Sequence, residues 1–270
     1  MKRVAAIMFA IAIAIPATAQ NAATQQPIRP MPRPQDAPTA AAPAQVTPPQ
    51  AVEETENVAA PSRAIAAKGQ RDLLRQDDAT YASCLVALHD LAVVYEEVVA
   101  VVPEDDVDCG ILQPIKVSEI APGVALVPPA VIRCPTAQAL ASWVQDFVLP
   151  AAARLDGRGA LTAIENGSGY TCRRRNNEDD GALSEHAFGN AFDVMGFRFE
   201  LGSPVMVGPG KSQDGLARAF QDAVWASACL DFATVLGPGS NASHEDHLHF
   251  DIIARKNGFR ICELGAAIEE

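Results

Sequence analysis

Histidine and aromatic residues are scarce in this 270-residue chain, which has five histidines and only 6% Phe, Trp and Tyr. Its six cysteines include no Cys-x-x-Cys pair, so the usual spacing of a thiolate zinc site is absent. Basic residues are outnumbered by acidic ones, 21 to 33, for a formal net charge of -12. This acidity excludes the electrostatic attraction that binds nucleic acid or an anionic membrane surface.

Long apolar runs are also missing, apart from one at the start of the chain. After Met1, Lys2 and Arg3 comes an apolar run of about a dozen residues, shorter than the ~20 that a spanning helix needs. It ends at Pro16 and the small-residue triplet at 17–19, which is typical of a cleaved secretory signal peptide. Cleavage after residue 19 removes two positive charges and no acidic residue, so the net charge goes from -12 to -14. We therefore expect no membrane span in the exported protein and place it in the bacterial periplasm.

The cysteines support an exported protein. An even number of cysteines in an exported chain predicts structural disulfides. The sequence does not choose among the possible pairings of Cys84, Cys109, Cys134, Cys172, Cys229 and Cys262.

The composition divides the rest of the chain into three parts. Residues 20–68 are rich in Pro, Ala and Gln, and cannot bury enough apolar surface to offset the entropy of ordering. This segment is expected to be a disordered linker, either a spacer or an arm that docks on an envelope partner. Residues 69–265 are long enough for one domain with its own core, and 266–270 form a short tail.

Helical and strand patterns alternate in the domain without a regular βαβ rhythm. A helix is predicted over 136–155, capped by Thr136, and a second over 215–230. Strand patterns occupy 93–102, 161–166, 191–201 and 247–253. This mixture predicts an α+β fold, with helices flanking a central antiparallel sheet.

Four of the five histidines lie in two short segments. Residues 247–253 read HLHFDII, and on a strand the side chains of His247, His249 and Asp251 would share one face, opposite an apolar face. Such a polar face, with a further histidine at His244, is better explained by a metal pocket than by the chance exposure of one face of a half-buried sheet.

The second segment, residues 184–193, reads SEHAFGNAFD. Gly189 interrupts any helix there, and a turn at this glycine can bring His186 back beside Asp193. Ser184 has no Gly-x-Ser-x-Gly elbow around it and is not expected to be a nucleophile. With one histidine from 244–251, His186 and Asp193 make three N/O ligands. Three such ligands and one open position are typical of a catalytic zinc site.

These motifs resemble a known superfamily. The pattern from Ser184 to Asp193, followed by a C-terminal His-x-His, resembles the zinc D-Ala-D-Ala carboxypeptidases and peptidoglycan endopeptidases, whose fold the hedgehog signalling domain shares. The strings GSGYTCR, LSEHAFGNAFDVMGF, VLGPGSN and HEDHLHFD further resemble the bacterial extensin-like C-terminal domain family. The resemblance implies a zinc metallopeptidase that hydrolyses peptidoglycan stem peptides or cross-links, as a D,D-endopeptidase or carboxypeptidase.

The resemblance also implies roles for individual residues. His186, Asp193 and His249 correspond to zinc ligands, and Asp246 to the carboxylate general base. On a continuous strand the side chains of Asp246 and His249 would point to opposite faces of the sheet. Asp246 can therefore be the base only if the strand begins after residue 246. If it begins earlier, Glu245 or His247 is the better base. His244 and His247 match histidines that some members place around the metal.

An arginine after the Ser-Gly-Tyr motif polarises the scissile carbonyl in these enzymes. Arg173 lies near that place, but Thr171 and Cys172 intervene, so Arg174 or Arg175 could serve instead.

Two other functions are compatible with the same residues. One is a non-catalytic, zinc-containing module that binds the cell wall. The other is a purely structural domain held by its disulfides.

Overall fold

The computed structural model describes residues 69–208 and 215–265. The predicted signal peptide 1–19, the linker 20–68 and the tail 266–270 lie outside these residues. Within them, no helix is both long and apolar enough to cross a membrane.

One mixed sheet runs through the described residues, with strand order β1-β2-β3-β4-β5-β8-β7-β9 and with β6 paired to β5. Its pairs are antiparallel except β3 with β4 and β7 with β9. The strands are β1 (Val94–Glu97), β2 (Pro114–Ala121), β3 (Val124–Arg133), β4 (Leu161–Ser168), β5 (Ala191–Phe199), β6 (Val205–Met206), β7 (Thr234–Leu236), β8 (Leu248–Asp251) and β9 (Ile261–Cys262). The predicted α+β fold is confirmed, and the sheet is mostly antiparallel, with two parallel pairs that the prediction of an antiparallel sheet did not include.

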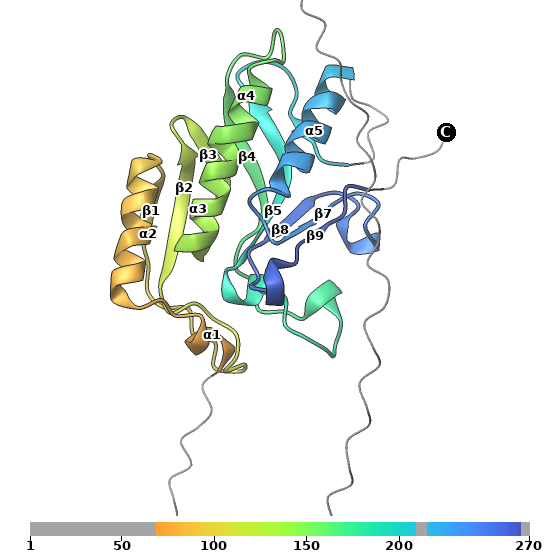
Figure 1. Ribbon diagram of the computed structural model, residues 1–270. Coiled ribbons are helices and arrows are strands. Elements are labelled where there is room, and N and C mark those ends of the chain that lie inside the picture. The colour runs from red at the N-terminus through yellow and green to blue at the C-terminus, as the bar shows by residue number, and fades with distance from the viewer. Residues whose placement is uncertain (1–68, 209–214, 266–270) are drawn as a thin grey trace, which may run out of the picture. The chain divides into compact units, whose positions relative to one another are not determined.

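Helices pack on the sheet and bury its apolar side (Figure 1). They are α2 (Asp78–Asp90), α3 (Cys134–Trp143), α4 (Leu149–Ala152) and α5 (Gly215–Ala228), with a π-helical turn over Val144–Val148. The short helix α1 (Gln70–Leu73) buries none of its residues. Trp143 is fully buried in the core, and its indole N–H donates to the carbonyl of Val224 at 3.0 Å. Its ring packs edge-on against Phe250 of β8 at 5.1 Å. This core holds β8, which carries part of the site described below.

The predicted cap at Thr136 is wrong. Helix α3 begins at Cys134, after an extended Arg133 and with Pro135 in its first turn, where the missing proline N–H costs nothing. The fully buried Thr136 hydroxyl instead donates to the carbonyl of Gly189 at 2.8 Å. The start of α3 therefore supports the turn that carries His186.

All six cysteines form disulfides, which confirms the prediction and supplies the pairing. Cys84–Cys134 joins α2 to the start of α3, Cys109–Cys172 holds the loop after β4, and Cys229–Cys262 joins the end of α5 to β9. Such a set of disulfides is typical of proteins that fold outside the reducing cytoplasm.

Candidate metal centre

A tight turn places His186. Ser184 precedes the 3₁₀ turn Glu185–Phe188, and its hydroxyl oxygen accepts the N–H of His186. Gly189 ends the turn with φ 65°, where a β-carbon would collide with the side chain of Ile111. Because the carbonyl of Gly189 accepts bonds from Thr136 and the Arg133 N–H, this turn is held firmly.

Sheet register places the other two residues. Asp193 of β5 lies directly opposite His249 of β8, so their side chains project from the same face. Asp193 Oδ1 lies 2.9 Å from His249 Nδ1 and 3.1 Å from His186 Nε2, and the two histidine nitrogens are 3.1 Å apart. All three residues are buried. The structure thus brings together the His186–Asp193–His249 triad that the motifs single out.

The triad has the chemistry and spacing of a metal site. Ligands at ~2.0–2.1 Å around a tetrahedral zinc lie about 3.3 Å from one another, close to the separations observed here. Two imidazoles and a carboxylate also suit other transition ions, so the donor set supports a metal without naming it. A second cluster, Asp106 with Cys109 and Cys172, offers no thiolate because its cysteines are bonded to each other.

Neighbouring groups orient both histidines. His186 Nδ1 lies 2.6 Å from the carbonyl of Gly169, which accepts its proton and leaves Nε2 for a metal. His249 Nε2 faces the carboxylate of Asp251 at 3.6 Å, so Nδ1 is its donor atom toward the triad. The alternation of side chains along the strand predicts that Asp251 shares a face with His249. No feature of the sequence predicts that the Gly169 carbonyl bonds His186.

Burial and mutual contact set the charges of the triad. Burial alone would raise the pKa of Asp193, but hydrogen bonds and charge from His186 and His249 hold it well below its usual range. Burial alone would lower the pKa of His249, but its bonds to Asp193 and Asp251 raise it to about 9. The metal-free triad therefore retains a proton at neutral pH.

That proton makes metal binding depend on pH. Because a metal ion must displace the proton from His249 below about pH 9, raising the pH favours the metal. We expect the apparent affinity for Zn²⁺ to rise about tenfold per pH unit from pH 6 and to level off near pH 9. Competition with a chelator measures this, and calorimetry in two buffers counts the protons released. A constant affinity over that range would contradict the proposed protonation.

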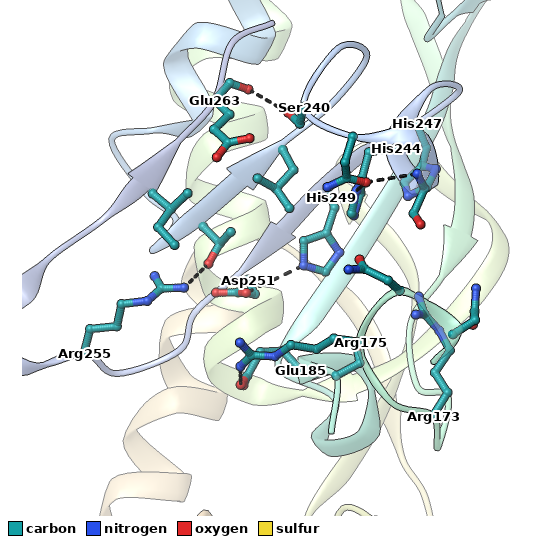
Figure 2. A pocket seen from close by; sticks show the side chains of 18 residues that line it. Arg173, Arg175, Glu185, Ser240, His244, His247, His249, Asp251, Arg255 and Glu263 are labelled. Atoms are coloured by element: carbon teal, nitrogen blue, oxygen red, sulfur yellow. Dashed lines mark hydrogen bonds and ion pairs between the residues drawn. The ribbon is translucent and has the colours of Figure 1, made fainter. Parts of the chain in front are cut away.

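Two histidines before β8, His244 and His247, lie near His249 (Figure 2). Since β8 begins at Leu248, His247 precedes the strand, with Nε2 3.8 Å from Asp193 Oδ1 and Nδ1 2.9 Å from Asp246 Oδ1. The Asp246 side chain is 75% exposed and contacts the triad only through His247. The ring of His244 lies 5.5 Å from that of His249, and burial with the nearby histidines lowers its pKa to about 4.

The arginines after Cys172 take three different positions. Arg173 lines the pocket described next, and its guanidinium forms no hydrogen bond or ion pair within the described residues. Arg174 instead donates to the carbonyl of Gly181 and lies outside that pocket. Arg175 lines it but lies 3.7 Å from the buried Glu185. Arg173 is therefore the best placed of the three to meet a ligand.

A pocket of about 400 Å³ opens onto the triad at His249 (Figure 2). Its walls include His244, His247 and Arg173, but not Glu245 or Asp246. This volume is within the range of pockets that enclose small ligands.

A protein-family model described as "Extensin-like protein C-terminus" matches residues 82–263, which include the triad and all the flanking residues above. No curated protein and no solved structure matches the chain.

Proposed function

The chain belongs to the extensin-like protein C-terminus family, and from its site we propose an exported zinc metallopeptidase that cuts peptidoglycan stem peptides or cross-links. The buried His186–Asp193–His249 triad at an open pocket is the observation that carries this proposal. The proposal includes the periplasmic location, and the relationship to the D-Ala-D-Ala peptidases and their hedgehog-like fold.

The donor set supports zinc as the resident ion. The imidazoles of His186 and His249 and the carboxylate of Asp193 would hold the ion, and a set of three such ligands is typical of catalytic zinc sites. A bound zinc ion would polarise the carbonyl of the substrate and lower the pKa of a bound water to about 7.

His247 is the residue best placed to move a proton. Its Nε2 points toward the triad, while its Nδ1 is held by the carboxylate of Asp246. A general base must come within hydrogen-bond reach of the proton it takes. His247 meets this condition better than Asp246 or the exposed Glu245, so we assign Asp246 the task of orienting the imidazole.

Arg173 and His244 complete the proposed site. The guanidinium of Arg173 is available for the carbonyl oxygen that becomes negative during peptide hydrolysis. His244, whose Nδ1–H donates to Asn241 Oδ1 at 2.7 Å, is neutral near pH 7, so its Nε2 can only accept a hydrogen bond. Both residues line the same pocket as His249 (Figure 2).

Digestion of purified sacculi tests the function. The zinc-loaded protein is expected to release soluble fragments whose masses identify the bond cut, by separating endo- from exopeptidase and D,D- from L,D-products. Activity should vanish after chelation and return with Zn²⁺. If the zinc-loaded protein binds sacculi and releases nothing, the chain is instead a wall-binding module.

A further inference from the structure

The pocket extends beyond the metal centre, across the open face of three neighbouring strands. His249 of β8 pairs with Leu236 of β7, and β7 pairs with β9 through Thr234 with Ile261. One residue further along this parallel register, Glu263 lies beside Leu236, and its N–H bonds the carbonyl of Val235 at 2.9 Å. The row His249–Leu236–Glu263 therefore crosses the pocket floor.

The last disulfide determines which side chains face this floor. Along β9 and the residue after it, Ile261 and Glu263 point to one side and Cys262 to the other. Cys262 is bonded to Cys229 at the end of α5, so Ile261 and Glu263 are directed into the pocket that they line. The floor between His249 and Glu263 is aliphatic, because Leu236 and Ile261 are half-buried there.

Glu263 is the available charge at this end of the pocket. Its carboxylate has no hydrogen bond or ion pair within the described part of the chain. The nearby Arg255 is engaged elsewhere, with Nη1 on the carbonyl of Ala233 at 2.7 Å and Nη2 on the hydroxyl of Thr234 at 2.6 Å. Figure 2 shows Glu263 across the pocket from His247 and Arg173.

The spacing indicates which ligand fits. Adjacent strands lie ~4.8 Å apart, so Glu263 stands about 10 Å from His249 across the floor. A four-carbon side chain ending in an ammonium reaches about 6 Å from its α-carbon, and its apolar stem can lie on Leu236. We propose that Glu263, Leu236 and Ile261 form a subsite for the amino-terminated side chain of a diamino acid in the bound stem peptide. This inference rests on the proposed peptidase function.

Binding of two matched peptides tests the subsite. N-acetyl-L-Lys-D-Ala-D-Ala and its norleucyl counterpart differ only in the terminal ammonium. Both are titrated by NMR against the zinc-loaded full chain carrying His247→Gln, which is expected to slow hydrolysis during the measurement. We expect the lysyl peptide to bind about three- to fivefold more tightly, the size expected of an ion pair near solvent.

Two further variants locate the effect. Glu263→Gln is expected to abolish the preference, whereas Glu104→Gln, at an exposed acid outside the pocket, should keep it. Equal binding of the two peptides, or a preference unchanged by Glu263→Gln, overturns the subsite. Failure of both peptides to bind overturns it as well. Because sacculus digestion by the wild-type protein is measured separately, either result can be told apart from failure of the peptidase proposal.

Discussion

Replacing Asp193 by asparagine is expected to weaken Zn²⁺ binding by at least about a hundredfold, and to remove hydrolysis of sacculi with it. The carboxylate is the one anionic donor of the triad, and it contacts both histidine donors at 2.9–3.1 Å. Loss of a group that merely orients a ligand costs about 10- to 100-fold in affinity, so loss of a ligand itself should cost at least as much. Metal content after dialysis and chelator competition measure the effect.

Two matched variants make this result specific. Asp222→Asn removes the same charge from an exposed position on α5 and should bind zinc as the wild type does. Asp251→Asn leaves all three donors in place but weakens the support of His249 Nε2, so an intermediate loss of about tenfold or more is expected. Stoichiometric zinc with unchanged affinity in folded Asp193→Asn would rule out this triad as the metal site.

Replacing His247 by glutamine is expected to lower kcat by about 10²- to 10⁴-fold, the usual contribution of a general acid–base group. Zinc content should stay at the wild-type level because His247 is not among the three donors. Asp246→Asn keeps the hydrogen-bond acceptor on His247 Nδ1 but removes its charge, so a smaller loss of about tenfold is expected. The readouts are kcat and KM on soluble cross-linked fragments, together with metal analysis.

The order of these effects identifies the base. If Asp246→Ala costs more than His247→Gln at equal zinc content, the carboxylate moves the proton and the assignment to His247 is wrong. Glu245→Gln is the control, because Glu245 is exposed and lies outside the pocket. A shift of the acidic limb of the kcat profile in Asp246→Asn would further show that this carboxylate tunes His247.

Much of the site can be predicted from local pattern. Alternation along a strand places His249 and Asp251 on one face and Leu248 and Phe250 in the core, as the structure has them. A glycine that interrupts the segment around His186 predicts a turn, and Gly189 indeed has a left-handed conformation. These predictions succeed because strand alternation and glycine geometry depend only on the nearest residues.

Prediction fails where residues far apart in the chain compete for one position. Thr136 is a good helix cap by its residue type, but the helix begins earlier, with Pro135 in its first turn. The Thr136 hydroxyl instead donates to the carbonyl of Gly189. The choice among Asp246, Glu245 and His247 was also left open by the sequence. β8 begins at Leu248, as the Asp246 alternative required, but the Asp246 side chain is 75% exposed and bonds His247, which no strand pattern predicts.

The sequence by itself therefore determined the α+β class, the presence of disulfides, the family and the three residues of the triad. Only the tertiary structure decided the cysteine pairing, the donor atom of His249, the nearness of His247 to Asp193, and the reach of the pocket to Glu263. The physical reason is that residue types and short periods are local, whereas register and packing join segments separated by tens of residues. Asp193 and His249 meet only because β5 and β8 pair in one register, and a shift of one residue would turn them to opposite faces.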